Sequence, residues 1–176
     1  MPFIVTDSPP TDAQRHRVAM LLGRKPRGLR AIAVTDVNDD PIVIRVSSVV
    51  DDKPFPTLYW LVGAELSLRI DRLEASGWIA RLQERVDMTP ALQVALREDH
   101  VLHKRLRADY MTAEERDFLY ASGMQKAFDG RGIGGIADSS RIRCLHTWYA
   151  AHLVAPNSVG AMVDALLKEG EYLATD

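Results

Sequence analysis

The residues best suited to chemistry lie in one stretch of the chain, between Gly130 and His146. A glycine-rich run opens it, and a segment with two arginines, the single cysteine and a histidine closes it. Glycines allow positive φ and close backbone approach, and free amides at a helix N-terminus attract anions. The stretch therefore predicts a phosphate or carboxylate site built from Arg131, Gly132, Gly134, Gly135, Arg141 and Arg143.

The same glycine run is also consistent with a flexible connection between two helices, flanked by solvated arginines. It does not follow the Gly-x-x-x-x-Gly-Lys-[Ser/Thr] pattern, and no predicted strand precedes it, which argues against a nucleotide P-loop. The anion site and the plain connection both remain open on the sequence alone.

Cys144 and His146 are the candidate catalytic residues. We expect a helix from about Ser140 to Val154, whose N-terminus and nearby arginines would favour a nucleophilic thiolate at Cys144. His146 would serve as acid, base or anion donor. The alternative for each is structural: a small core cysteine and a hydrogen-bonded histidine. Helical residues two apart point about 200° apart, so the sequence predicts no metal site here.

Two other groups of residues are weaker candidates. His100 and His103 lie one turn apart on a predicted helix, and the charged residues around them predict a solvated face rather than a metal site. The basic run from Gly23 to Arg30 would contact phosphate or an acidic partner. It is short and contains no aromatic residue, so it does not predict nucleic-acid recognition.

Composition describes an ordinary globular protein. The chain has 176 residues, of which 47% are hydrophobic and 26% charged, typical of one domain with a sizeable core. Its net charge of −2 provides no general attraction for nucleic acid or an anionic membrane. One cysteine forms no internal disulfide, and we find neither a signal peptide nor a run of about 20 apolar residues. These features predict a cytoplasmic protein without membrane insertion.

The secondary-structure pattern predicts an α+β fold. Residues 31–34 and 42–46 have the β-branched pattern of a hairpin, and residues 57–62 that of a third strand. Thr11-Asp12-Ala13-Gln14 and Thr112-Ala113-Glu114-Glu115 have the spacing of capping boxes, and Gly23 would end the first helix. From Ala64 onward, helical periodicity and capping signals predominate. We therefore expect a small antiparallel N-terminal sheet of about three strands and about six helices. Residues 1–176 would form a single domain, with a loose lead (1–10) and a loose tail (171–176).

Four segments in order resemble a bacterial family of uncharacterised proteins, domain of unknown function 501: residues 22–28, 54–61, 72–77 and 141–146. Asn157-Ser158-Val159-Gly160 is similar to the family's Asn-Pro-x-Gly. The resemblance implies no activity, but it adds Asn157 to the anion-site residues and supports Gly134, Gly135, Arg141, Cys144 and His146. Relatives often have cysteines or a histidine where this chain has Asp36-Val37, Val62-Gly63-Ala64 and Ala151. If relatives bind a metal through those residues, this chain lacks most of the ligands.

The sequence leaves two functional hypotheses. In the first, the protein binds a phosphorylated or carboxylated small molecule at the glycine-rich loop and helix N-terminus, with His146 and Cys144 performing the chemistry. In the second, it is a non-catalytic interaction or regulatory protein that docks a protein partner, and the Arg-x-Arg-Cys-Leu-His segment is structural. The pattern identifies no cofactor.

Overall fold

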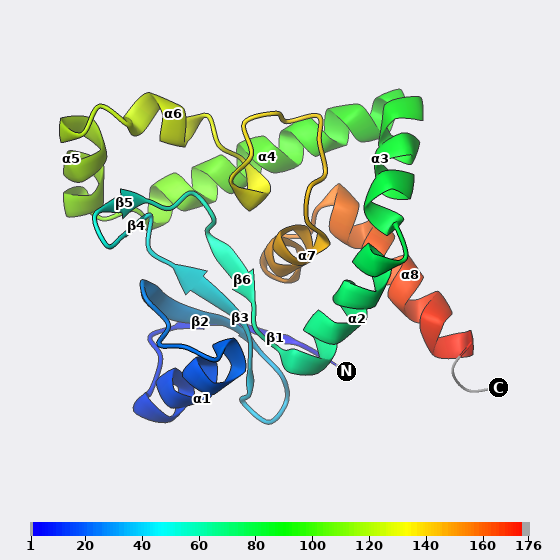
Figure 1. Ribbon diagram of the computed structural model, residues 1–176, viewed down its shortest axis with the longest axis horizontal. Coiled ribbons are helices and arrows are strands. Elements are labelled where there is room, and N and C mark those ends of the chain that lie inside the picture. The colour runs from blue at the N-terminus through cyan, green and yellow to red at the C-terminus, as the bar shows by residue number, and fades with distance from the viewer. Residues whose placement is uncertain (1, 174–176) are drawn as a thin grey trace.

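The structure, a computed structural model, describes the backbone of residues 2–173 and the side chains of residues 2–168. It has the predicted α+β class, with the sheet near the N-terminus (Figure 1). In chain order the elements are β1 (Ile4–Ser8), α1 (Asp12–Leu22), β2 (Leu29–Thr35), β3 (Pro41–Val46), β4 (Val49–Val50), β5 (Lys53–Pro54), β6 (Tyr59–Leu61), α2 (Ala64–Ala75), α3 (Trp78–Met88), α4 (Pro90–Tyr110), α5 (Ala113–Ala121), α6 (Gln125–Asp129), the 3₁₀ turn η1 (Ile133–Gly135), α7 (Leu145–Val154) and α8 (Ser158–Leu173).

The main sheet is antiparallel with the order β1-β2-β3-β6, and β4 and β5 form a separate small hairpin. The predicted hairpin of β2 and β3 is confirmed, and the third predicted strand shortens to β6. The fourth strand, β1, comes from the segment expected to be a loose lead: Ile4 pairs with Thr35 at the sheet edge. The sequence of this segment did not predict a strand, because four of the five β1 residues are exposed and the apolar pattern of a buried strand is missing.

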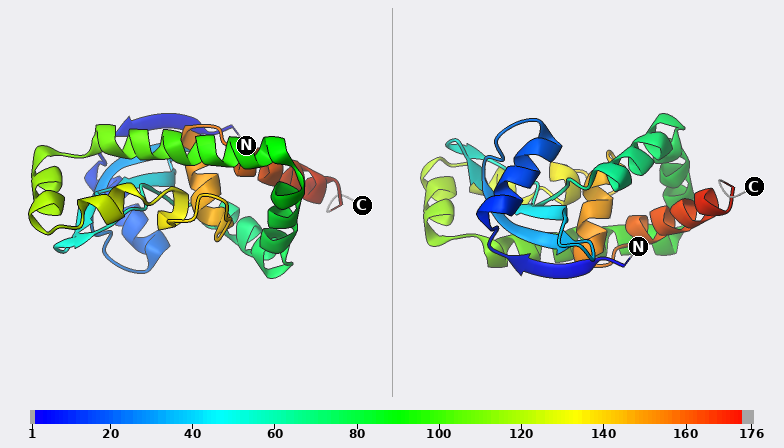
Figure 2. Two further views of the ribbon diagram at one scale, coloured as in Figure 1. Left: turned by 90° about the horizontal axis from the view of Figure 1, so that it is seen from above. Right: turned by 90° about the horizontal axis from the view of Figure 1, so that it is seen from below.

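Both faces of the sheet are covered, which explains why β2 and β3 are almost continuously apolar. α1 packs on one face through Val18, which contacts a cluster with Ile32 and Ile44. On the other face, Val34 and Val43 join the larger core that contains α7 and part of α4. Figure 2 shows α1 and α4 on opposite sides of the sheet.

Several helix ends follow the predicted capping chemistry. Thr11 and Thr112 each form a capping box, and Gly23 ends α1 in the left-handed conformation. The described residues contain eight α-helices rather than about six, partly because α5 stops at Ala121 and α6 forms separately. α8 extends to Leu173, so part of the expected loose tail is helical, and residues 174–176 lie outside the described residues.

α7 occupies the centre of the fold, against β6, α2 and α8. Its apolar residues are not confined to one side, and Trp148, Tyr149, Ala150 and Ala151 are all buried, the pattern of a helix enclosed by its neighbours. Within the described residues no single helix is long and apolar enough to cross a bilayer; α7 and α8 pass only as a pair, bent by 100°.

The prediction of a solvated face at His100 and His103 is wrong. Their exposed fractions are 1% and 4%, because the glycine-rich segment and α7 cover His100 and the Tyr59 ring of β6 lies against His103. The Ile133 amide donates a 3.0 Å hydrogen bond to His100 Nδ1, and the Trp148 ring lies 4.9 Å from the His100 ring. The sequence prediction failed because the residues around these histidines in α4 are charged, whereas the groups that bury them come from distant parts of the chain.

Candidate functional site

The start of α7 brings Cys144 and His146 together with a residue from another helix. α7 begins at Leu145, not near Ser140 as predicted, and Cys144 is its N-cap with an extended φ of −152°. The Leu145 amide donates a 2.5 Å hydrogen bond to Oε1 of Glu74, near the C-terminal end of α2. An internal carboxylate therefore already binds at the helix N-terminus where we expected an external anion.

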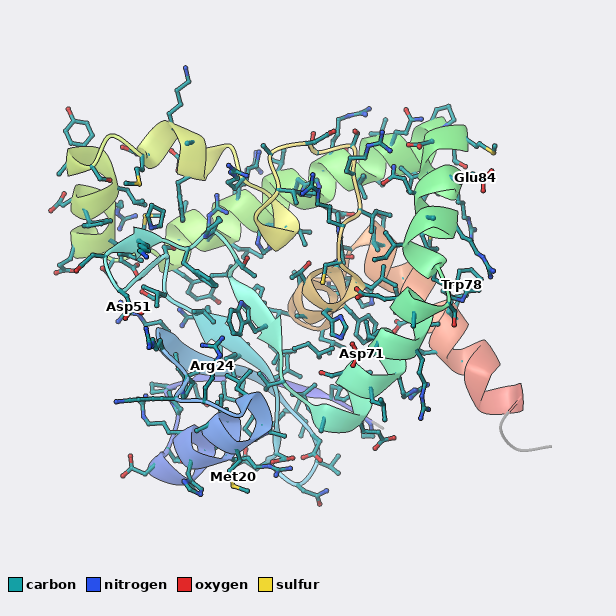
Figure 3. The ribbon with its side chains drawn as sticks, in the orientation of Figure 1. Met20, Arg24, Asp51, Asp71, Trp78 and Glu84 are labelled. Atoms are coloured by element: carbon teal, nitrogen blue, oxygen red, sulfur yellow. The ribbon has the colours of Figure 1, made fainter. Side chains whose placement is uncertain are left out.

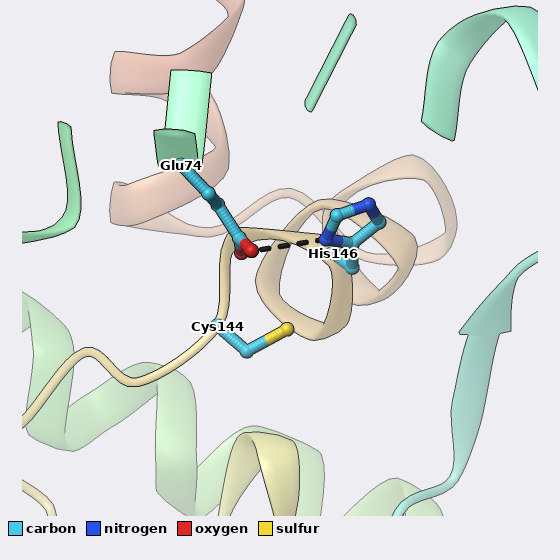
Figure 4. A group of neighbouring side chains, drawn as sticks. All are labelled: Glu74, Cys144 and His146. Atoms are coloured by element: carbon cyan, nitrogen blue, oxygen red, sulfur yellow. Dashed lines mark ion pairs between the residues drawn. The ribbon is translucent and has the colours of Figure 1, made fainter. Parts of the chain in front are cut away.

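Glu74, Cys144 and His146 form a compact cluster. One carboxylate oxygen, the thiol sulfur and one imidazole nitrogen all lie within 4.8 Å of one another. His146 Nδ1 is 3.3 Å from Glu74 Oε1, and Figure 4 shows the Cys144 side chain directed toward the same space. The extended backbone at Cys144 removes the 200° separation of a regular helix, so the two residues can face one ion or one ligand.

The far side of the His146 ring is also held in place. Nε2 lies 3.3 Å from the Ser67 carbonyl and 3.3 Å from Asp71 Oδ1. A proton on Nε2 can bond to either oxygen, which leaves Nδ1 available to face Glu74 and Cys144. Both Ser67 and Asp71 belong to α2, so a single helix orients the imidazole and also supplies the carboxylate.

The surroundings of His146 favour its charged form. Its pKa is raised to about 9, chiefly by hydrogen bonding to the Cys144 side chain, with the negative charge of Glu74 adding to the effect and burial opposing it. The site remains open to solvent, since the side chains of His146 and Glu74 are 23% and 25% exposed. A half-buried imidazole next to a thiol and a carboxylate can exchange a proton, and it can bind a cation once it has lost one.

The glycine-rich loop is bonded within itself and to α4. Gly132 N–H donates to the Ile136 carbonyl, Ile133 N–H to His100, and Gly135 N–H to the Gly132 carbonyl. A Cβ at Gly132 would lie 2.1 Å from His100 Nδ1, and Gly134 and Gly135 have positive φ. The glycines thus allow close packing on α4, and three of the loop amides have partners inside the protein.

The remaining predicted anion-site residues are spread over different contacts. Arg131 bonds to the Gly135 carbonyl, Arg141 lies 3.8 Å from Asp87, and Arg143 is exposed beside Cys144. Asn157 is buried, where its amide donates to the Trp148 carbonyl and its carbonyl accepts from Gly160 N–H. Anion binding by these residues stays a prediction; Asn157 has both polar groups in use.

Sequence reasoning missed Glu74 and Asp71. Both lie on a predicted amphipathic helix, where acidic residues are usually solvated, and both are some 70 positions from Cys144. The available signal was the segment Arg72-Leu73-Glu74-Ala75-Ser76-Gly77, one of those on which the family resemblance rests. It contains the carboxylate that meets the cysteine and the histidine.

Comparison with known proteins agrees with the resemblance seen in the sequence. Residues 32–165 match the family described as "Protein of unknown function (DUF501)". No curated protein and no solved structure matches the chain. The match covers the sheet from the middle of β2 onward, α2 with Glu74, and α7 with Cys144 and His146. The chain belongs to the DUF501 family.

Proposed function

We propose that this protein binds a zinc-like divalent metal ion through Glu74, Cys144 and His146, and that the ion captures an anionic small molecule. The observation that carries this proposal is the approach of three different ligand types to within 4.8 Å of one another. Carboxylate, thiolate and imidazole are the side chains that bind zinc in proteins. A carboxylate and a thiolate would together neutralise a divalent cation.

The surrounding hydrogen bonds fit a metal centre. Histidines that bind metals usually donate their second ring N–H to a carboxylate or a backbone carbonyl, and bound carboxylates are hydrogen-bonded as well. Nε2 of His146 has Asp71 and the Ser67 carbonyl within 3.3 Å, and Glu74 Oε1 accepts from Leu145. The second oxygen of Glu74 would then be available to the ion.

Three protein ligands leave a tetrahedral ion one position for water or a substrate. We assign that position to a phosphorylated or carboxylated small molecule, because such groups bind to divalent cations and the exposed Arg143 adds positive charge next to Cys144. The single cysteine would remain a thiol in a reducing cytoplasm, where we place this activity.

The second candidate is a structural role for the segment in a protein that docks a partner. It is favoured by the internal hydrogen bonds of the glycine loop and by the bond from Leu145 to Glu74. In that case His146 is only an ion-pair partner of Glu74 and Asp71. The two functions differ in whether the cluster binds a metal.

The test is titration of the metal-free protein with Co²⁺, whose visible absorption reports coordination geometry and thiolate ligation. We expect one ion per chain, displaced by Zn²⁺. Cys144→Ser, His146→Gln and Glu74→Gln should each weaken binding by at least about tenfold, comparable to losses seen even for outer-shell changes. His16→Gln is the matched control, because His16 is exposed on α1.

Circular dichroism of each variant separates lost binding from lost folding. Absence of a thiolate band in the folded wild type, or equal binding by Cys144→Ser, would exclude the metal centre and leave the structural role. Addition of inorganic phosphate and acetate to the Co²⁺ protein then tests the substrate position. An unchanged spectrum would exclude the anion ligand while leaving the metal site intact.

A further inference from the structure

A second site lies on the other side of the sheet, away from α7. Residues 24–27, which follow α1, face the β4–β5 hairpin across a cavity of about 450 Å³. Its volume is within the range of small-molecule sites, about 300–1,000 Å³. Figure 3 labels Arg24 and Asp51, which come from the two segments that border this cavity.

The cavity has a strong excess of positive charge. Four cations border it, Arg24, Lys25, Arg27 and Lys53, and all four residues are exposed. Asp51 is the only carboxylate among the lining residues, and it forms an ion pair with Arg27. A local charge of +3 in a chain of net charge −2 indicates a ligand that carries negative charge.

Aromatic rings form part of the same cavity. Phe55 and Trp60 line it with ring centroids 5.5 Å apart, and the Arg24 guanidinium lies 5.2 Å from the centre of the Trp60 ring. The basic run contains no aromatic residue of its own, but folding brings these two from a segment about 30 residues later. Indole rings and guanidinium planes both stack on planar heterocycles.

The backbone holds the two sides of the cavity together. Gly28 has a φ of 71°, and a Cβ there would lie 2.6 Å from the Val50 side chain, so only glycine lets the basic segment approach β4 this closely. The Ser47 amide donates to the Gly28 carbonyl at 2.8 Å. Asp51 and Asp52 both have positive φ and form the tight turn of the β4–β5 hairpin.

We infer that this cavity binds a small molecule that combines a planar heterocycle with phosphate groups, of the nucleoside polyphosphate class. The heterocycle stacks beside Trp60 and Arg24, and the phosphates bind Lys25, Arg27 and Lys53. The negative charge of the whole chain opposes a long polyanion, which favours a mononucleotide over nucleic acid. This inference is independent of the proposed metal centre.

The experiment is calorimetric titration with three probes: ATP, inorganic triphosphate and adenosine. We expect ATP to bind more tightly than either fragment, because only ATP has both the ring and the charges. Arg24→Ala and Trp60→Leu should each weaken ATP binding by at least about tenfold, the effect of losing one charged or stacking contact. Arg81→Ala and Trp78→Leu are matched controls, since Arg81 stacks on Trp78 at 4.9 Å on α3.

A gain of affinity gives an independent check. Asp51→Asn removes the single lining carboxylate and frees Arg27, and asparagine accepts the positive φ of this turn, so ATP should bind several-fold more tightly. Equal binding of triphosphate and ATP would overturn ring recognition. Unchanged ATP binding in Arg24→Ala, or tighter binding of a single-stranded oligonucleotide than of ATP, would overturn the mononucleotide site.

Discussion

The Leu145 amide and the Glu74 carboxylate, 71 positions apart in the chain, are joined by a 2.5 Å hydrogen bond. This bond satisfies a free amide at the N-terminus of α7 with a negative charge, the arrangement that the helix dipole favours. It also connects α2 with α7. As a result, the carboxylate lies beside His146 and Cys144, and the candidate site and the helix cap share one residue.

Loss of the Glu74 carboxylate should reduce the stability of the protein. Glu74→Ala leaves the fully buried Leu145 with an unsatisfied amide, which costs about 1–3 kcal/mol of unfolding free energy. Glu74→Gln keeps an acceptor oxygen and should cost less than half as much. Urea denaturation measures both, with Glu84→Ala on exposed α3 surface as the control. Equal stability of Glu74→Ala and Glu84→Ala would show that the bond is not formed.

Asp71 should act on metal binding through His146. Asp71→Asn weakens the acceptor next to Nε2 without touching the three ligand atoms, so Co²⁺ affinity should fall about tenfold while the absorption spectrum keeps its thiolate band. Asp71 is 64% exposed, and we therefore expect almost no change in unfolding free energy. A large loss of stability with unchanged affinity would contradict this positioning role.

Two buried histidines should make the protein unstable in acid. Burial lowers the pKa of His100 to about 4 and of His103 to about 3, against about 6.5 in the unfolded chain. Below pH 6.5 the unfolded chain therefore binds protons that the folded chain excludes. The unfolding free energy should fall by about 1.4 kcal/mol per pH unit for each histidine as the pH drops from 6.5 toward 4.

His103→Leu tests directly whether His103 contributes to this loss of stability in acid. His103 Nε2 is buried without a hydrogen-bond partner among the described residues, so an apolar replacement of similar size loses no bond at that atom. Urea denaturation between pH 4.5 and 6.5 should give a slope smaller by about 1.4 kcal/mol per pH unit than in the wild type. An unchanged slope would show that His103 does not exclude the proton.

His146 should stabilise the folded protein at neutral pH and lose this effect as the pH rises. Because its folded pKa is raised to about 9, the folded chain holds a proton that the unfolded chain releases above pH 6.5. Its stabilising contribution is complete below pH 6.5 and disappears as the pH rises to 9. His146→Gln should flatten the fall in unfolding free energy over this range, measured without added metal; a slope identical to the wild type would contradict the raised pKa.

Glycine substitutions should separate packing from flexibility in the loop. Gly132→Ala would place a Cβ 2.1 Å from His100, so we expect a loss of about 3 kcal/mol or more in unfolding free energy, as for severe overpacking. At Gly130 the φ is −64° and the nearest atoms to a Cβ are 3.5 Å away. Gly130→Ala should therefore change stability by less than about 0.5 kcal/mol, as at ordinary surface positions. Similar effects at both sites would rule out close packing on α4.

The sequence by itself determined the local features of this protein. The capping boxes at Thr11 and Thr112, the apolar β2–β3 hairpin and the end of α1 at Gly23 depend on neighbouring residues, and each was predicted correctly. Family membership was also recognisable from short segments along the chain. These signals depend on bonds within a few residues, so they can be read without knowing how the chain folds back on itself.

The tertiary structure determined which residues meet at the candidate sites. Only folding brings Glu74 to Cys144 and His146, buries His100 under the glycine-rich loop and His103 beside Tyr59, and adds Trp60 to the basic segment. Cys144 is two positions from His146, but the Glu74 carboxylate that adds to the pKa shift and the elements that bury His100 and His103 lie far away in the chain. A pattern confined to one helix or loop does not show such distant partners, so the sequence singled out Cys144 and His146 as candidates but not Glu74.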